Sequence, residues 1–225
     1  MQDYIWVTGI ILKQSPAGEY DRRISLLTRE KGKVAAFARG ARKPGSRLAA
    51  ATIPFSFGNF KLYEGRSSYT LSEADVKNYF EELRSDYIGA CYGMYFAEVT
   101  DFCTREGNDE REMMKLLYQS LRALCAASLP NPLVRCIFEC RTMAVNGEFP
   151  RDFTKEAFAE LAGAGEAEDS TLYALRYITS SPVEKLYTFN VTNSVLGQLQ
   201  AVADRYMKRF AGHQFKSLEV LQTLC

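Results

Sequence analysis

The chain is 225 residues long, enough to bury a substantial hydrophobic core, and its formal net charge is only +1. No run approaches the roughly 20 consecutive apolar residues of a membrane-spanning helix, and the start, Met1 to Tyr4, lacks the positive charge of a secretion signal. These features argue against an integral membrane protein and a secreted one. We therefore expect a cytoplasmic protein that does not bind membranes.

The neutral total hides an uneven distribution of charge. Residues 1–80 contain thirteen Lys and Arg against seven Asp and Glu, a net charge of +6. Residues 81–225 contain fifteen Lys and Arg against twenty Asp and Glu, a net charge of −5. A basic front and an acidic back predict two domains, which we place at residues 1–78 and 79–225.

The first domain is predicted to consist of five short β-strands. Each is a run rich in aromatic and β-branched residues, and turn-forming residues separate the runs. The predicted strands are Tyr4–Leu12, Ile24–Thr28, Val34–Arg39, Phe55–Tyr63 and Tyr69–Ala74. Gly58 interrupts the fourth strand, where we expect a β-bulge. Five strands joined by hairpins predict a small barrel of the OB type, with an SH3-like barrel as the structural alternative.

Positive charge is concentrated on the second and third predicted strands and the loop after them. The nine basic residues between positions 22 and 47 are Arg22, Arg23, Arg29, Lys31, Lys33, Arg39, Arg42, Lys43 and Arg47, against the single acid Glu30. The segment 30–33 has the composition of a hairpin turn, and the glycines and proline of the segment 40–47 predict a mobile loop. Cations displayed in this way neutralise the phosphates of a nucleic-acid backbone, so all nine are predicted binding residues. A solvated hairpin is the alternative.

Aromatic residues in the same domain favour nucleic acid as the ligand. Single strands are held by a basic groove together with rings on which the bases stack. The aromatic residues of the predicted strands include Trp6, Phe37, Phe57, Phe60, Tyr63 and Tyr69. Because a small barrel also needs an aromatic core, half or more of these rings must face inward.

The second domain is predicted to be entirely α-helical. Apolar residues recur at helical spacing, and Asn, Asp, Pro and Gly mark the ends of the segments. The predicted helices are about 81–104, 109–124, 130–146, 154–161, 170–178, 192–210 and 217–224. The fold class is therefore α+β, with a five-stranded OB-fold barrel followed by an all-α domain.

No catalytic constellation can be assembled from the sequence. His213 is the only histidine, and the loop beginning at Gly40 lacks the Lys-Ser/Thr pair of a nucleotide-binding loop. The six cysteines are most simply small buried hydrophobes; Cys136 and Cys140 share a helix face but lack two further metal ligands. We expect a binding protein without metal or cofactor, and not an enzyme.

Several motifs resemble the bacterial RecO recombination mediators in order and spacing. They include Gly9–Lys13, Glu19–Arg22, Leu27–Lys33, Arg39–Lys43 and Ser46–Leu48, with weaker matches at Tyr95–Glu98, in the helix Leu133–Gly147 with Pro150, and at Lys216–Leu221. The resemblance covers the predicted barrel well and the helical domain in outline. It implies a nucleoid-associated DNA repair and recombination protein with an OB-fold followed by a helical domain.

The resemblance also implies an activity and a set of partners. Members of this family bind single- and double-stranded DNA, anneal complementary strands without ATP, and with RecR help RecA to replace single-strand-binding protein (SSB), which links them indirectly to RecA and RecF. Many bind the acidic C-terminal tail of SSB through the helical domain, and Arg122 and Arg135 are our candidates for that contact. One departure is clear: many members carry a cysteine zinc site after the equivalent of Gly147–Pro150, and here no cysteine follows until Cys225.

Two other functions fit the same residues. One is a protein-interaction adaptor whose barrel and acidic helical domain dock other proteins without annealing DNA. The other is an RNA-binding OB-fold module, which would prefer RNA to DNA of the same sequence.

Overall fold

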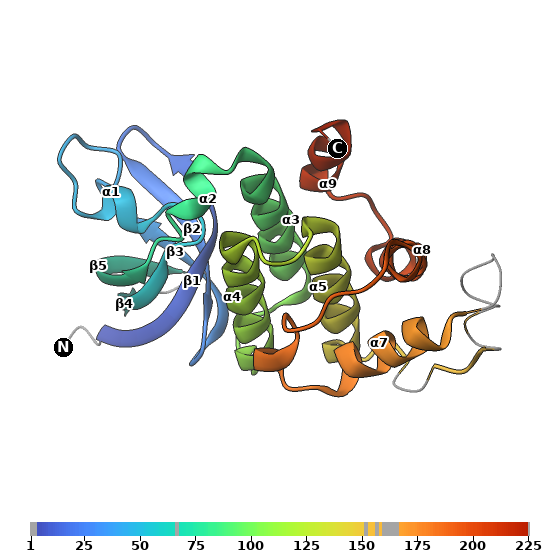
Figure 1. Cartoon of the computed structure of the whole chain (residues 1–225). Coiled ribbons are helices and arrows are strands. Elements are labelled where there is room, and N and C mark those ends of the chain that lie inside the picture. The colour runs from blue at the N-terminus through green and yellow to red at the C-terminus, as the bar shows by residue number, and fades with distance from the viewer. Residues whose placement is uncertain (1–3, 66–67, 151–152, 156–157, 159–166, 225) are drawn as a thin grey trace. The chain divides into compact units, whose positions relative to one another are not determined.

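The structure, a computed structural model, describes residues 4–65, 68–150, 153–155, 158 and 167–224 (Figure 1). Two compact units make up the chain, Met1–Met114 and Lys115–Cys225. The last strand ends at Asn78 and the next helix begins at Glu82, so the predicted division at residue 78 falls where strands give way to helices. As a domain boundary it stays a prediction.

The first unit contains a closed five-stranded β-barrel, as predicted. Its strands are β1 (Tyr4–Ala17), β2 (Asp21–Thr28), β3 (Gly32–Ala38), β4 (Phe57–Glu64) and β5 (Tyr69–Asn78), with the short helix α1 (Leu48–Ala51) between β3 and β4. The order around the barrel is β1-β2-β3-β5-β4, and β4 pairs with β1 to close it. All pairs are antiparallel except β3 with β5, which run parallel. This is the OB arrangement rather than the SH3-like alternative.

Strand β1 is longer than its composition predicts. We expected it to end at Leu12, because Pro16 and Gly18 mark a connection, but it continues to Ala17. Its first half pairs with β4 and its second half with β2, and the register shifts between Ile11 and Lys13. Tertiary pairing therefore overrides the local turn signal, since the irregularity lets one strand serve two partners.

The predicted irregularity at Gly58 is present. The register between β4 and β5 shifts between Phe57 and Gly58. A Cβ atom on Gly58 would lie 2.3 Å from the carbonyl oxygen of Asp75, closer than real Cβ atoms come. Glycine is needed here because the two backbones approach one another so closely.

Alternation along the strands divides the aromatic residues between core and surface. Phe60 is fully buried and Tyr69 is 6% exposed, and both pack in the barrel core with aliphatic residues of every strand. Phe37, Phe57 and Tyr63 are half-buried on the outside. Trp6 is 52% exposed, so this large ring does not contribute to the core.

Three helices follow the barrel in the first unit: α2 (Glu82–Ser85), α3 (Tyr87–Cys103) and the beginning of α4 (Arg111–Ala126). The side chain of Asp86 caps α3 by accepting a hydrogen bond from the Gly89 backbone nitrogen at 2.9 Å. Helix α3 contacts β1. It therefore covers part of the outer face of the barrel.

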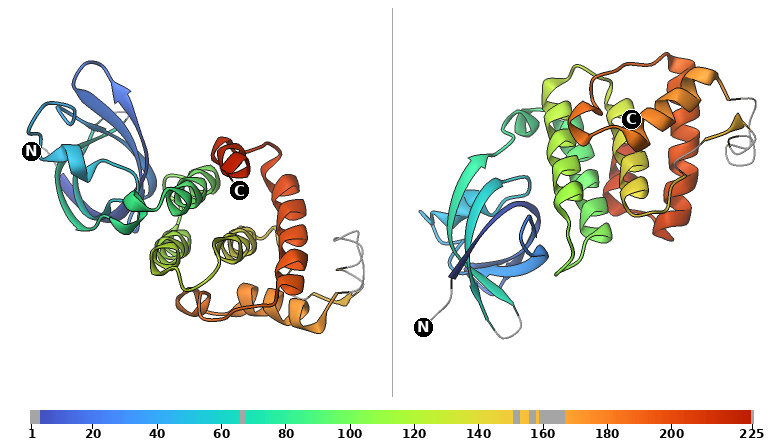
Figure 2. Two further views of the ribbon diagram at one scale, coloured as in Figure 1. Left: turned by 45° about the horizontal axis from the view of Figure 1, so that its top comes forward. Right: turned by 90° about the horizontal axis from the view of Figure 1, so that it is seen from below.

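The regular elements of the second unit are all helical among its described residues. After α4 come α5 (Asn131–Val145), α7 (Asp169–Ser180), the 3₁₀ turn η1 (Val183–Lys185), α8 (Asn193–Ala211) and α9 (Lys216–Leu224). Helix α5 contacts both α7 and α8, as Figure 2 shows, and its inward side chains are fully buried. The predicted helix 154–161 lies mostly outside the described residues. None of the described helices is both long and apolar enough to cross a membrane.

Candidate nucleic-acid interface

The predicted basic residues are displayed by the antiparallel β2–β3 ribbon and by the loop that follows it. Pairing runs from Arg22 opposite Ala38 to Thr28 opposite Gly32, so the turn and the loop lie at opposite ends of the ribbon. With about 3.3 Å per residue, the two ends are roughly 20 Å apart. The cations therefore form two groups: a tip group of Arg29, Lys31 and Lys33, and a base group of Arg22, Arg23, Arg39, Arg42, Lys43 and Arg47.

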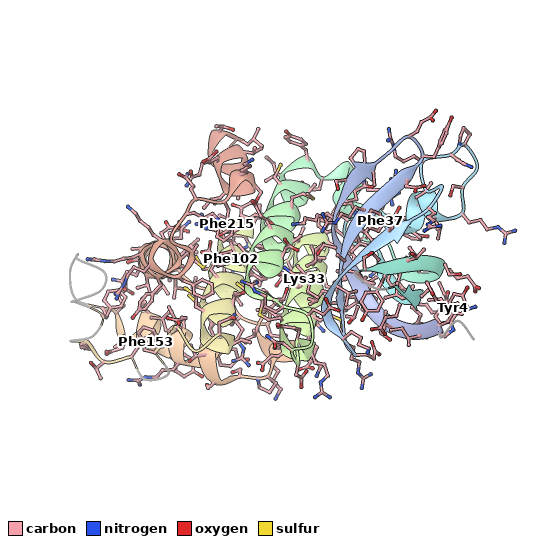
Figure 3. The ribbon with its side chains drawn as sticks, turned by 180° about the vertical axis from the view of Figure 1, so that it is seen from behind. Tyr4, Lys33, Phe37, Phe102, Phe153 and Phe215 are labelled. Carbon is pink, nitrogen blue, oxygen red and sulfur yellow. The ribbon has the colours of Figure 1, made fainter. Side chains whose placement is uncertain are left out.

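Lys33 is held by helix α3. Its Nζ lies 3.3 Å from Oδ1 of Asp101 and also donates to the Asp101 carbonyl oxygen, and its side chain is only 21% exposed. Figure 3 labels Lys33 on the side of the ribbon that faces the helices of its unit. These contacts give Lys33 a role in joining α3 to the barrel, and its predicted contact with DNA stays a prediction.

Asp101 is the centre of that junction. It accepts hydrogen bonds from Lys13 Nζ at 2.6 Å and from Ser25 Oγ at 2.7 Å, in addition to its ion pair with Lys33. Although burial opposes the shift, the hydrogen bonds from Lys13 and Ser25 and the charge of Lys33 lower the pKa of Asp101. The ionised carboxylate thus connects α3 to three strands, through Lys13 in β1, Ser25 in β2 and Lys33 in β3.

Arg22 also has a structural contact. Its Nη1 donates to the carbonyl oxygen of Ala49 at 2.6 Å and to Oγ1 of Thr52 at 2.8 Å. Both acceptors lie in or directly after α1, so Arg22 fixes the segment that follows the basic loop. Like Lys33, it is half-buried.

The other seven predicted cations have no carboxylate partner among the described residues. They are Arg23, Arg29, Lys31, Arg39, Arg42, Lys43 and Arg47. All are exposed except Lys31, which is half-buried. Unpaired surface cations in such number produce a positive potential that attracts polyanions. The base group supplies five of the seven.

Part of the base group lies on the outer face of the ribbon beside an aromatic ring. Arg23 and Phe37 are directly opposite one another in the register, and the exposed Arg39 follows the last residue of β3. The side chains of Arg23 and Phe37 point to the same face of the ribbon, whereas Ala36 and Ala38 beside Phe37 are fully buried. Phe37 is labelled on this face in Figure 3. The face therefore combines the guanidinium group of Arg23 with a half-buried ring, and Arg39 lies directly after its edge.

The basic loop is anchored, although its glycines and proline predicted a mobile one. Its backbone forms successive turns, with Lys43 N donating to Gly40 O and Ser46 N to Lys43 O, both at 3.1 Å. Arg42 N donates to the carbonyl oxygen of Tyr20 at 2.8 Å, and Gly40 N donates to Oδ1 of Asp21 at 2.7 Å. Gly40 and Gly45 adopt positive φ, which permits these turns. The loop is held against the β1–β2 turn with its cations outward.

Tyr20 belongs to this site, and sequence reasoning missed it. The ring is 44% exposed on the β1–β2 turn, and Lys43 Nζ lies 5.4 Å from its centroid. A hydrogen bond with Glu19 raises the pKa of the Tyr20 hydroxyl above its ordinary value of 10.0. The sequence signals were its position in a polar connection, where a ring is not needed for a core, and its place in the motif Glu19–Arg22.

The tip group lies beside an open hollow with balanced charge. This hollow of about 480 Å³ is lined in part by Arg29, Glu30, Asp109 and Arg111. Nε of Arg111 donates to Oδ1 of Asp109 at 2.7 Å. Two cations and two acids leave no net charge for an anion, so the base group remains the better binding surface.

The two arginines predicted to contact a partner differ in their surroundings. Arg122 is exposed on α4, and its Nη1 lies 3.5 Å from Oε1 of Gln119. Arg135 on α5 is only 15% exposed, because it pairs with Glu139 at 2.8 Å and with Asp204. Arg122 is thus accessible to an acidic peptide, whereas the charge of Arg135 is already compensated.

The remaining candidates for chemistry do not form a reactive or metal-binding cluster among the described residues. His213 is exposed, with Nδ1 3.0 Å from the carbonyl oxygen of Ala211. Cys136 and Cys140 are buried, and burial raises the pKa of both thiols. Among the described residues, no three His, Cys, Asp or Glu side chains converge on a point that would suit a metal ion.

Comparison with known proteins gives consistent matches along the chain. Residues 1–80 match the family model of the N-terminal region of recombination protein O, and residues 84–158 match that of its C-terminal region. A DNA repair protein RecO from Acetivibrio thermocellus is 29% identical over 246 residues, covering 99% of this chain and 98% of the relative. Those of Clostridium novyi and Bacillus cereus are 25% and 27% identical, over 96% and 97% of this chain and 93% and 96% of the relatives.

Proposed function

The chain belongs to the RecO family, whose role is in DNA repair and recombination, and on that premise we propose that it is a DNA-binding mediator that anneals complementary strands. With RecR, it assists RecA in loading onto DNA coated with SSB, in the cytoplasm at the nucleoid. It acts by binding rather than by catalysis. The DNA contacts are made by the cations of the ribbon and loop, above all by the base group.

The observation that carries this proposal is the set of seven cations without carboxylate partners among the described residues. A cation that already pairs with an acid gives up that pair when it meets a phosphate, whereas an unpaired cation releases only the counterion of the phosphate. Arg22 and Lys33 contribute less to DNA binding for this reason, because their donors are already used inside the protein. Arg23 meets the DNA strand on the outer face of the ribbon, and Arg39, Lys43 and Arg47 extend that contact along the loop.

The proposal is tested by annealing complementary strands that are coated with SSB and given no nucleotide. The variant replaces Arg39, Lys43 and Arg47 with Gln, and it retains Arg42, whose Nη1 donates to Gly18 O at 3.2 Å and helps to hold the loop. We expect the wild type to anneal and this variant to lose most of the activity. A matched control removes the same number of exposed cations from α8, namely Arg205, Lys208 and Arg209, and retains activity. Equal activity of the two triple variants would contradict the proposal.

We also propose that Arg122 contacts the acidic tail of SSB. Its guanidinium is exposed, so a carboxylate can approach it, and a charge-assisted hydrogen bond there is stronger than a neutral one. Replacing Arg122 with Ala weakens binding of a tail peptide in a titration and leaves binding of naked DNA unchanged. A variant that binds the peptide like the wild type would remove Arg122 from the interface.

A further inference from the structure

The turn between β1 and β2 carries a ring that the core does not use. Tyr20 is 44% exposed, yet its backbone is fixed, because its carbonyl oxygen accepts a hydrogen bond from Arg42 N at 2.8 Å. Nη1 of Arg42 also donates to the carbonyl oxygen of Gly18 in the same turn, at 3.2 Å. The ring is therefore presented to solvent from a rigid support, beside the cations of the loop.

The ring has both an acid and cations near it, because its hydroxyl hydrogen-bonds with Glu19 while Arg42 and Lys43 of the loop contact the same turn. Lys43 Nζ lies 5.4 Å from the centroid, within the range of a cation–π contact. No other aromatic ring of the described residues packs against Tyr20, so the ring does not belong to an aromatic cluster of the fold. A half-exposed ring can stack on the base of a nucleotide, and the ammonium and guanidinium groups beside the ring can bind its phosphate.

We propose that Tyr20 is the platform on which an unpaired nucleobase stacks while Lys43 and Arg42 neutralise the adjoining phosphates, an inference that rests on the proposed DNA-binding function. Both faces of a base in a duplex are covered by its neighbours, whereas a single strand exposes them. The ring therefore gives a cationic surface, which by itself binds any nucleic acid, a preference for single strands. Stacking on one aromatic side chain changes affinity by about 5- to 150-fold.

A second group of exposed rings on the barrel does not share this character. Tyr4 and Trp6 lie near Lys61, whose Nζ is 5.1 and 5.9 Å from their centroids. Lys61, however, pairs with Glu73 at 2.8 Å, and Asp75 lies two residues further along the same strand. Because Glu73 already neutralises Lys61, this face has no excess positive charge to bind phosphates. Tyr20 is therefore the better candidate for base stacking.

The test compares Tyr20→Ala and Tyr20→Phe in the full chain, with Tyr87→Ala as the matched control. Tyr87 lies in the same unit and is 65% exposed. Fluorescence anisotropy with labelled oligothymidylate and with a duplex of equal length gives the dissociation constants at several salt concentrations. We expect Tyr20→Ala to weaken single-strand binding about tenfold or more, with duplex binding within about twofold of wild type and the salt slope unchanged. Tyr20→Phe and Tyr87→Ala bind like wild type.

The outcomes separate this inference from the function on which it rests. If the wild type binds single strands with a steep salt dependence and Tyr20→Ala binds equally well, stacking on Tyr20 is refuted and DNA binding stands. If Tyr20→Ala loses single-strand and duplex binding equally, the ring only supports the loop. If the wild type shows no salt-dependent binding, both proposals fail. A variant that unfolds at the same Tm as the wild type has no folding defect. Wild-type binding by Tyr20→Phe then identifies the ring, rather than the hydroxyl, as the cause of the loss in Tyr20→Ala.

Discussion

Replacing Asp101 with Ala tests whether the contact between α3 and the barrel depends on one carboxylate. The change removes the hydrogen bond from Ser25 at 2.7 Å and the ion pair with Lys33 at 3.3 Å, both in a region where Asp101 is 17% exposed. It also removes the pair with Lys13, which contributes little because the lysine is 65% exposed. About 1 kcal/mol for the hydrogen bond and 1–2 kcal/mol for the half-buried pair give a loss of about 2–3 kcal/mol.

Thermal unfolding followed by circular dichroism measures this loss, which corresponds to a fall in Tm of about 5–10 °C. The matched control is Asp109→Ala. Like Asp101, Asp109 forms an ion pair, but its side chain is 60% exposed and that of its partner Arg111 is 58% exposed. The control lowers Tm by much less, because solvent screens an exposed pair and the change otherwise removes only the hydrogen bond from Arg111 N at 3.2 Å. If Asp101→Ala shifts Tm no more than Asp109→Ala does, the assigned role of Asp101 is wrong.

The same carboxylate predicts a dependence of stability on pH. Because the pKa of Asp101 is lower in the folded protein than its ordinary value of 3.8, the ionised form stabilises the fold. That contribution is complete above the ordinary pKa and is lost as the pH falls through the lower pKa of the folded state. Between neutral pH and pH 5 the difference in Tm between wild type and Asp101→Ala stays constant, and it shrinks in more acidic solution. A difference that stays constant below pH 3 would contradict this assignment.

Two further substitutions test the packing of each unit. Gly58→Ala places a Cβ 2.3 Å from the Asp75 carbonyl oxygen, so we expect a loss of about 1–3 kcal/mol in urea unfolding; a loss no larger than that of Gly197→Ala, where nothing lies within 4 Å, would refute the steric argument. Arg135→Met leaves the fully buried Glu139 without its guanidinium partner and costs about 3–5 kcal/mol, and the double change with Glu139→Gln recovers much of it. A double variant as unstable as the single one would show that the ion pair is not the cause.

Much of the barrel could be predicted from its sequence, because its signals are local. Alternating apolar residues identify strands, and Gly-containing polar segments such as Glu30–Lys33 identify hairpin turns, so the five strands were all expected. The end of β1 was not, since its second half is stabilised by pairing with β2 rather than by its own composition. The bulge at Gly58 was expected because a glycine interrupts the alternation.

The candidate site could be predicted only in part. Its basic residues are visible as a continuous run, but antiparallel pairing separates the turn from the loop and so divides the cations between two ends. The partner of Lys33 is Asp101, 68 residues away, and no local pattern joins them. The role of Tyr20 was not predicted either, although it lies in the motif Glu19–Arg22, because its exposure and the neighbouring lysine become visible only in the structure.

The central claim is that the base group of cations binds the phosphates of DNA, and the salt dependence of binding tests it most directly. The logarithm of the binding constant for a labelled single strand is plotted against the logarithm of the salt concentration. The slope is negative, and each lost phosphate contact makes it less steep by about 0.7. Replacing Arg39, Lys43 and Arg47 with Gln should therefore reduce its magnitude by about 2 relative to wild type. The control at Arg205, Lys208 and Arg209 should keep the wild-type slope. A ribbon variant with the wild-type slope would contradict the account.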